Sequence, residues 1–243
     1  MEEIKVNGIV LSVTEYGEKD ALLTIFTAEL GKITAKIRGV KSDRAKFKHA
    51  CQPFCFGEWV CSRKGEYFTV TSFSLIDNFY DLTLDYDNFV LCTTFLEICN
   101  KILRPNIISE ELFVALITSL KNIVYEEINK YLVAVKFYLI ATSILGYTLS
   151  FDCCGSCGLN IKSDIYLSNV TNDFCCVPCS NRNGQLTSRE EYNILKIINY
   201  TAFDKLSTIK IKNEVLIKVL VILKYNLENI FNSKIISFSK INF

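Results

Sequence analysis

Two Cys-x-x-Cys pairs are the residues of this chain whose types and spacing most clearly predict chemistry. Cys154 and Cys157 form the first pair, Cys176 and Cys179 form the second, and 18 residues separate the two pairs. This spacing is typical of a four-cysteine zinc site. Two thiolates three residues apart on a tight turn can face one ion, and a second turn completes a tetrahedron of sulfurs. Because protein fills all four positions, we predict one structural zinc ion per chain, with no open position for an activated water.

Each pair has a spare cysteine beside it, because Cys153 precedes Cys154 and Cys175 precedes Cys176. A Cys-x3-Cys choice, in which the two spare cysteines replace their neighbours as ligands, therefore stays open. The x2 pairs suit tight turns better, since glycine and proline flank or interrupt them. We expect the spare cysteines to be small apolar fillers. The predicted ligands are Cys154, Cys157, Cys176 and Cys179.

Disulfides and a redox-active pair are the alternatives to metal binding. The chain starts Met1-Glu-Glu-Ile-Lys, without the apolar segment of a signal peptide, so we expect a reducing, cytoplasmic compartment. Stable disulfides are uncommon in such a compartment. A thioredoxin-like protein would have a single Cys-x-x-Cys near a βαβ unit, whereas here two pairs are followed by a helical pattern. We therefore favour metal binding.

A strongly basic segment lies between Gly31 and Ala50, although the whole chain has a net charge of only +1. Lys and Arg occur there seven times, against one acid, Asp43. Phe47 lies among these cations, and such a mixture lets bases stack while phosphates are neutralised. The alternative is a solvated charged loop that Phe47 anchors to the core. The predicted nucleic-acid-binding residues are Lys32, Lys36, Arg38, Lys41, Arg44, Lys46, Phe47 and Lys48.

The sequence lacks the phosphate-binding patterns of nucleotide-driven enzymes, because neither Gly-x-x-x-x-Gly-Lys-(Ser/Thr) nor Gly-x-Gly-x-x-Gly occurs. His49 is the only histidine, so no constellation of two histidines can form. Acid pairs such as Glu110/Glu111 lie at predicted helix ends, where they suit capping better than acid–base catalysis. We therefore expect a protein that is not an enzyme. A zinc-stabilised enzyme of an unrecognised kind is the alternative.

The elements that must position the basic segment are short strands separated by glycine-containing turns. Predicted strands cover residues 4–13, 21–28, 32–40, 53–61 and 67–75. Five strands without a long helix among them predict a small barrel, and the five-stranded oligonucleotide-binding (OB) barrel is the leading candidate. Within the third strand, apolar residues alternate with Thr34, Lys36 and Arg38. One face of this strand therefore enters the core, while the other presents cations outward.

Charge and periodicity both change near residue 76. Asp77, Asp81, Asp85 and Asp87 occur between residues 76 and 91 without a Lys or Arg. Apolar residues then recur every three or four positions, which predicts amphipathic helices. We expect helices over about 85–104, 110–123, 128–145, 189–198 and 216–230, with 128–145 as the buried centre. Ser188-x-x-Glu191 is a capping box that opens the fourth helix.

The predicted fold class is α+β: an amino-terminal OB barrel followed by an all-helical domain that carries the four-cysteine module. The boundary at the charge change gives four parts. They are the barrel (1–78), the first part of the helical domain (79–150), the zinc module (151–182) and the second part of the helical domain (183–243).

Several motifs in this order resemble those of the DNA repair protein RecO family. In the amino-terminal half they are Tyr16-Gly17-Glu18-Lys19-Asp20, Phe26-Thr27, Gly31-Lys32, Arg38-Gly39-Val40-Lys41 and Gln52-Pro53-Phe54. Farther on they are Leu145-Gly146-Tyr147 and Phe151-Asp152-x-Cys154-x-x-Cys157-Gly158. The resemblance is strong over residues 8–54 and 145–179.

The resemblance implies a mediator of DNA recombination and repair. Such a protein binds single- and double-stranded DNA, anneals complementary strands and helps to load recombinase onto gaps covered by single-stranded-DNA-binding protein. The implied partners are DNA, RecR and single-stranded-DNA-binding protein, with RecF and the recombinase RecA reached indirectly, in a cytoplasmic location at the bacterial nucleoid. The residues alone leave a second function open, a zinc-stabilised protein–protein adaptor that binds no nucleic acid.

Overall fold

The computed structural model describes residues 2–40, 47–126, 128–162 and 164–241. The chain forms two compact units. One unit contains residues 1–86 and 96–114, and the other contains residues 87–95 and 115–243. The division into four parts by residue number stays a prediction.

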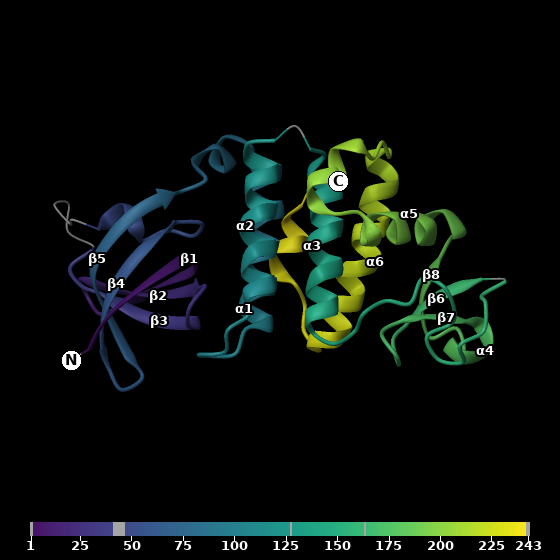
Figure 1. Ribbon diagram of the computed structural model, residues 1–243, viewed down its shortest axis with the longest axis horizontal. Coiled ribbons are helices and arrows are strands. Elements are labelled where there is room, and N and C mark those ends of the chain that lie inside the picture. The colour runs from purple at the N-terminus through teal and green to yellow at the C-terminus, as the bar shows by residue number, and fades with distance from the viewer. Residues whose placement is uncertain (1, 41–46, 127, 163, 242–243) are drawn as a thin grey trace. The chain divides into compact units, whose positions relative to one another are not determined.

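The first unit is built on a closed barrel of five strands (Figure 1). The strands are β1 (Glu2–Tyr16), β2 (Asp20–Thr27), β3 (Gly31–Ile37), β4 (Phe56–Lys64) and β5 (Tyr67–Asp77). Their order around the barrel is β1-β2-β3-β5-β4, with β3 and β5 parallel and the other neighbours antiparallel. This is the five-stranded OB-type barrel that the strand pattern predicts.

β1 closes the barrel because it pairs with two strands. Gly8 is opposite Gly57 of β4 and also opposite Thr27 of β2. A Cβ atom on Gly8 would overlap the Ile25 side chain, so only glycine allows this close approach. Beyond Gly8 the register of β1 against β2 shifts between Val10 and Ser12, a bulge that adds local twist.

Trp59 is the largest fully buried side chain of the barrel core. Its indole Nε1 donates a hydrogen bond of 2.9 Å to the carbonyl oxygen of Gly8. Its ring lies 4.2 Å from that of Phe73, centroid to centroid. The core therefore holds the backbone at the point where β1 changes partner, and the buried indole N–H is satisfied.

β4 begins three residues later than the predicted strand, and this difference has a local cause. Phe54 has a positive φ of 69°, so the chain turns there instead of extending. The Phe54 N–H donates to the Val10 carbonyl oxygen at 3.1 Å, and Val10 donates to Cys55 at 2.9 Å. These two bonds fix the turn against β1.

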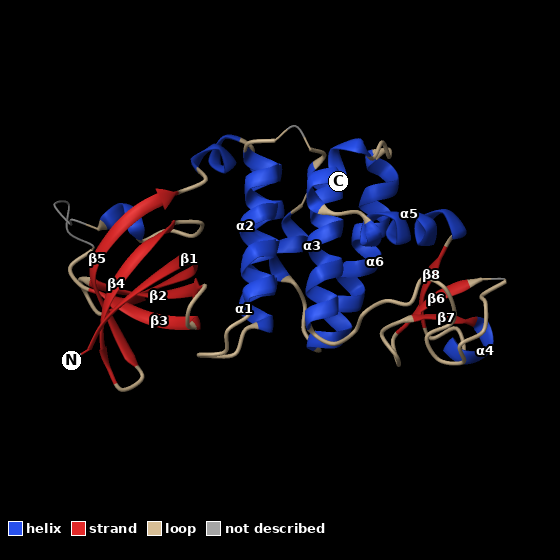
Figure 2. Cartoon of the chain, in the orientation of Figure 1, coloured by secondary structure: helices blue, strands red, loops and turns tan. Residues whose placement is uncertain are grey.

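The second unit is mainly helical (Figure 2). Helices α1 (Tyr86–Ile102) and α2 (Glu110–Val124) contribute their residues 87–95 and 115–124 to it. α3 (Lys130–Ile144), α5 (Arg189–Tyr200) and α6 (Asn213–Phe231) lie in it completely. The predicted capping box is confirmed, because the Ser188 hydroxyl accepts from Glu191 N and the Glu191 carboxylate accepts from Ser188 N. No helix of the described residues combines the length and the apolar character that a membrane span requires.

α3 is the buried centre of this unit, as its uniformly apolar sequence predicts. Ten of its residues are buried, and the Phe137 ring lies 4.5 Å from that of Phe95. Lys136 is a cation in the middle of this helix, and its ammonium donates to the carbonyl oxygens of Ile198 and Asn199 at 3.3 and 2.7 Å. These carbonyls belong to the last turn of α5, where cations are favoured. Burial lowers the pKa of Lys136.

Glu228 is a buried acid near the end of α6, with 7% of its side chain exposed. One carboxylate oxygen lies 2.9 Å from Lys224 Nζ and 3.5 Å from Lys234 Nζ, and the other accepts from Ile235 N at 2.8 Å. Burial alone would raise the pKa of Glu228. The hydrogen bonds from Lys224 and Ile235 and the charges of both lysines outweigh burial and lower that pKa.

We expect Glu228→Gln to lower the free energy of unfolding at pH 7 by about 1–3 kcal/mol, because Lys224 then loses its charged partner. Since the folded pKa of Glu228 is depressed, its contribution is complete above the unfolded value of about 4.3 and is lost as the pH falls through the folded value. The difference between parent and variant should therefore shrink below about pH 4. Urea unfolding at several pH values tests this. Glu66→Gln, at an exposed turn, is the control, and an unchanged difference at pH 3 would contradict the expectation.

Candidate metal centre and nucleic-acid surface

The four predicted ligand cysteines come together in the second unit. The sulfur atoms of Cys154, Cys157, Cys176 and Cys179 all lie within 4.8 Å of one another. The Sγ atoms of Cys157 and Cys176 are 3.9 Å apart. Four sulfurs at this spacing could hold a metal ion, and thiolate sulfur is the donor that favours zinc.

A tight turn presents the first pair. Cys154 N donates to the Leu159 carbonyl oxygen at 2.8 Å, and Gly158 N donates to the Cys154 carbonyl oxygen at 2.9 Å. Gly158 has a φ of 72°, a conformation that glycine adopts at little cost. The turn therefore brings Cys154 and Cys157 to the same side.

A strand end and a short helix present the second pair. Cys176 is the last residue of β7 (Phe174–Cys176), and Cys179 lies in α4 (Val177–Ser180), which has proline in its first turn. β7 pairs with β6 (Ile165–Ser168), and β6 pairs with β8 (Gly184–Thr187) in an antiparallel sheet of three strands. This sheet is not evident from the sequence, because strands of three or four residues give almost no periodic signal.

The cluster contains one thiol that ionises easily. Burial would raise the pKa of Cys154, but hydrogen bonds from the backbone N–H groups of Cys157, Cys176 and Ser156 lower it to about 6. By contrast, the hydrogen bond with the Cys176 thiol raises the pKa of Cys179 to about 12. Because zinc binds the thiolate form of cysteine, metal binding at this cluster would release the proton of Cys179.

The two spare cysteines do not belong to the four-sulfur cluster. Cys175 is fully buried, and its sulfur lies 3.4 Å from the Thr171 hydroxyl oxygen. Burial raises the pKa of Cys175. Cys153 is half-buried. This geometry favours the x2 pairs as ligands, and the ligand set stays a prediction.

Asp173, which is not among the predicted site residues, holds the segment that leads into the first turn. Its carboxylate accepts from Ser150 N and from the Ser150 hydroxyl, both at 2.7 Å. The Gly155 backbone lies against the same carboxylate, so a Cβ on Gly155 would overlap it. Gly155 N also donates to Phe174 O at 2.8 Å. A carboxylate 19 residues beyond Cys154 gave no signal in the sequence that could have linked it to this turn.

An aromatic cluster joins the cysteine module to α5. The rings of Phe151, Phe174 and Tyr192 are all buried, with centroid distances of 5.0 to 5.6 Å. Two polar contacts flank the cluster: Lys196 pairs with Asp152 at 2.8 Å, and Arg189 donates to the Ile161 carbonyl oxygen at 2.7 Å. Burial of three rings is the largest stabilising contribution at this junction.

The outward face of β3 carries cations that already have partners. The Lys32 ammonium donates to the backbone oxygen and side-chain oxygen of Asn100, at 2.7 and 3.2 Å, and burial lowers the pKa of Lys32. Lys36 pairs with Asp20 at 2.8 Å and lies over the Tyr16 ring at 4.7 Å. The hydrogen bond from Lys36, followed by that from Gly39 N, lowers the pKa of Asp20. The alternation predicted for β3 is confirmed, since Ile33, Ala35 and Ile37 are buried.

The predicted nucleic-acid residues beyond β3 differ in exposure. Arg38 is exposed and follows the strand, which ends at Ile37 because Gly39 takes a φ of 66°. Lys48 is exposed, whereas Phe47 is half-buried and packs against the barrel core. The predicted residues Lys41, Arg44 and Lys46 lie outside the described residues. The whole set stays a prediction.

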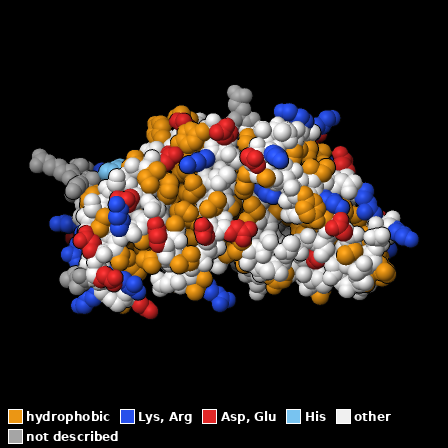
Figure 3. Space-filling model, in the orientation of Figure 1, with side chains coloured by type: hydrophobic (Ala, Val, Ile, Leu, Met, Phe, Trp, Pro, Cys, Tyr) orange, Lys and Arg blue, Asp and Glu red, His pale blue; other side chains and the backbone are white. Residues whose placement is uncertain are grey.

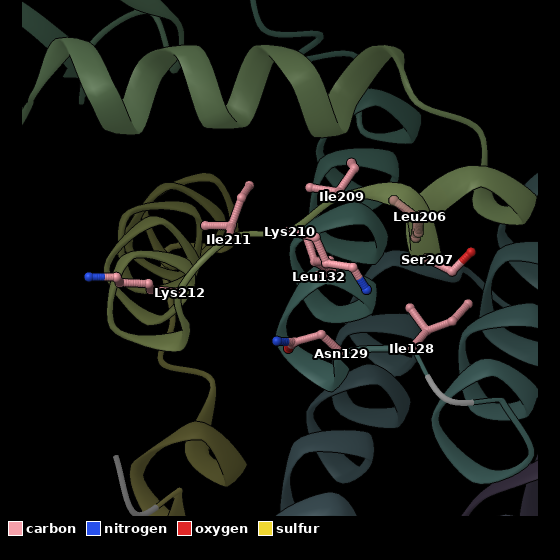
Figure 4. A pocket seen from close by; sticks show the side chains of 9 residues that line it. All are labelled: Ile128, Asn129, Leu132, Leu206, Ser207, Ile209, Lys210, Ile211 and Lys212. Atoms are coloured by element: carbon pink, nitrogen blue, oxygen red, sulfur yellow. The ribbon is translucent and has the colours of Figure 1, made fainter.

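A cavity of about 560 Å³ lies in the second unit, beside the amino-terminal ends of α3 and α6 (Figure 4). Asn129 caps α3 by accepting from Tyr131 N, and its Nδ2 donates to Asn213 at 2.6 Å. The lining is mainly aliphatic, with two lysines at its rim. The residues are Ile128, Asn129, Leu132, Leu206, Ser207, Ile209, Lys210, Ile211 and Lys212. Such a lining suits a ligand that is apolar and negatively charged.

The barrel, the helices and the four-cysteine cluster define a mixed α+β protein with an amino-terminal OB domain and a candidate metal module. The family model described as Recombination protein O N terminal matches residues 1–79, and that described as Recombination protein O C terminal matches residues 83–231. The chain therefore belongs to the RecO family of DNA repair and recombination proteins.

Several proteins similar to this chain are named DNA repair protein RecO. The DNA repair protein RecO of a Thermoanaerobacter species is 31% identical over 243 residues, which cover 96% of each chain. That of Clostridium novyi is 29% identical over 211 residues, covering 87% of this chain and 82% of the relative. That of Caldicellulosiruptor saccharolyticus is 28% identical over 211 residues, covering 87% and 86%. The similarity therefore extends across both units.

The choice of ligands can be tested by exchanging neighbouring cysteines. We expect Cys154→Ala and Cys176→Ala to lose zinc, because each removes a sulfur of the cluster. Cys153→Ala and Cys175→Ala should keep one zinc per chain. Metal analysis of the purified variants measures this. The opposite pattern, with metal lost only from the Cys153 and Cys175 variants, would show that the x3 choice is correct.

The close approach of Gly155 to Asp173 gives a second test of the module. Gly155→Ala should displace the carboxylate and lower zinc affinity about 10- to 100-fold, the range found when groups that orient metal ligands are removed. Asp173→Ala should lower zinc affinity by a similar factor. Because both substitutions act on one contact, the double variant should bind zinc no more weakly than Asp173→Ala alone. Competition with a chelator measures the affinities, and fully additive losses would contradict this explanation.

Proposed function

We propose that this chain is a non-enzymatic mediator of recombination that binds single- and double-stranded DNA and anneals complementary strands. In this proposal it helps to load the recombinase RecA onto gaps covered by single-stranded-DNA-binding protein. RecR and single-stranded-DNA-binding protein are direct partners, RecF is reached indirectly, and the protein acts at the cytoplasmic nucleoid. Family membership across nearly the whole chain is the observation that carries the proposal.

The barrel is the proposed site of DNA binding. Its third strand presents Lys36 outward, and exposed Arg38 and Lys48 follow in the chain. Arg38 and Lys48 are the first candidates because both are exposed, while Lys32 and Lys36 would share their charge with Asn100 and Asp20. The predicted cations at 41, 44 and 46 belong to the same proposed segment.

The four-cysteine module has a supporting role in this proposal. One zinc ion per chain would hold the two cysteine turns together without taking part in a reaction, because four protein sulfurs leave no ligand position open. The aromatic contacts of Phe151, Phe174 and Tyr192 would keep the module attached. The cavity beside α3 and α6 is the proposed place for a protein partner with an acidic, apolar segment.

The salt dependence of DNA binding tests the proposed site. About three to five phosphate contacts to single-stranded DNA should give a log–log slope of roughly −2 to −3.5 for affinity against salt. Arg38→Ala with Lys48→Ala should flatten that slope by about 1.4, since each contact contributes about 0.7. Affinity should fall alike for unrelated sequences, because phosphate contacts carry little sequence information. Fluorescence anisotropy at several salt concentrations measures both quantities.

Lys64→Ala, which removes an exposed cation at the end of β4, is the matched control and should leave the slope unchanged. A folded double variant with the parent's affinity and slope would place DNA binding elsewhere. A parent protein that binds no DNA at low salt would favour the adaptor function instead.

A further inference from the structure

An exposed apolar and acidic surface follows β5 in the first unit. We name it the acidic–apolar ridge and define it as Ile76, Tyr80, Asp81, Leu84, Asp85 and Tyr86. Its four large apolar side chains are 56%, 61%, 72% and 59% exposed, in chain order. Figure 3 shows hydrophobic and acidic side chains together over the segment that follows β5. Side chains of this size rarely gather on a surface unless another molecule covers them.

The short 3-10 helix η2 (Tyr80–Leu84) explains why these residues point outward. A 3-10 helix has three residues per turn, so residues three apart share a side. Phe79 and Leu82 share the inner side, and each is 1% exposed. The other side chains of the turn must then point away from the core. The buried pair anchors the ridge, and Tyr80 and Leu84 are left without a role in the core.

The backbone before η2 is held in an unfavourable conformation. Phe79 has φ 47° and ψ 42°, the left-handed region that bulky residues avoid. Its N–H donates to the Asp77 carboxylate at 2.8 Å, and its ring is buried, which together hold the conformation. An aromatic residue held in this region is strained, and strain of this kind is typical of functional surfaces. The strained turn displays Tyr80 at the start of η2.

The charge of the ridge excludes some partners. Residues 76 to 91 contain four aspartates and no Lys or Arg. Asp81 is exposed and has no ion-pair partner within the part of the chain that the structure describes. A negative surface repels the phosphates of nucleic acids and of anionic lipids. The partner that complements it must combine cations with apolar side chains.

We propose that the acidic–apolar ridge is a docking surface for a partner protein that presents a segment with Lys or Arg among apolar side chains. Tyr80 and Leu84 would pack against the apolar residues of that segment, and Asp81 and Asp85 would face its cations. Charge complementarity determines the sign of the partner's charge and raises the association rate, while burial of Tyr80 and Leu84 supplies affinity. This surface is separate from the cations proposed to bind DNA, so the inference does not rest on the proposed function.

Two labelled synthetic peptides of the same apolar sequence, one with lysine and one with glutamate at every polar position, provide the probe. Fluorescence anisotropy with the full chain should show binding of the lysine peptide and at least tenfold weaker binding of the glutamate peptide. Asp81→Lys should weaken lysine-peptide binding at least fivefold. Tyr80→Ser with Leu84→Ser should weaken it at least tenfold. DNA affinity should stay unchanged in both variants.

Asp164→Lys and Val170→Ser are the matched controls, since both positions are exposed in the cysteine module. Phe79 and Leu82 are kept in every variant, so the variants should unfold at the same temperature as the parent. If Asp81→Lys does not fold, Asp81→Asn replaces it and should weaken lysine-peptide binding about twofold. Equal binding of both peptides, or equal effects of ridge and control variants, would overturn the proposal. Sedimentation that shows a parent dimer and a monomeric ridge variant would also overturn it, because the occupant would then be a second copy.

Discussion

The pairing of β1 with two strands is the constraint on which the amino-terminal unit depends. Gly8 lies opposite both Thr27 and Gly57, so the sheet can close only where three backbones approach one another. No side chain fits there, and the Trp59 indole fills the space below it while bonding to the Gly8 carbonyl oxygen. Once the barrel is closed, the face of β3 that points outward is fixed, and with it the direction in which its cations point.

Contacts within the first unit also determine which cations are available. Lys32 reaches Asn100 and Lys36 reaches Asp20, so two cations of the basic segment stabilise the first unit as well as adding positive charge. Half-buried surface pairs of this kind contribute little to stability, because solvent still screens them. Their larger effect is on binding, since a phosphate must compete with a carboxylate or a carbonyl for the same ammonium group.

The cysteine module shows how a metal site depends on groups that do not bind the metal. Three backbone N–H groups lower the pKa of the Cys154 thiol, whereas the hydrogen bond with Cys176 raises the pKa of the Cys179 thiol. Asp173 ties Ser150 to the turn, and Gly155 leaves room for its carboxylate. Three aromatic rings then attach the module to α5. Ligand spacing alone describes only part of this arrangement.

The sequence by itself determined the features that depend on neighbours along the chain. The five strands, the helix stripes, the capping box at Ser188 and the spacing of the cysteines are local patterns, and periodicity of two or 3.6 residues reports them directly. The alternation in β3 also belongs here, because a strand places successive side chains on opposite faces. The family resemblance rested on motifs of the same local kind.

Only the tertiary structure decided the features that join distant residues. Asn100 is 68 residues from Lys32, and Asp173 is 23 residues from Ser150, so no local pattern could link them. The sheet of β6, β7 and β8 escaped prediction because its strands are too short to show a period. The exposure of Tyr80 and Leu84 likewise depends on which side of η2 the core accepts. Contacts of this kind follow from packing, which brings together residues that the sequence separates.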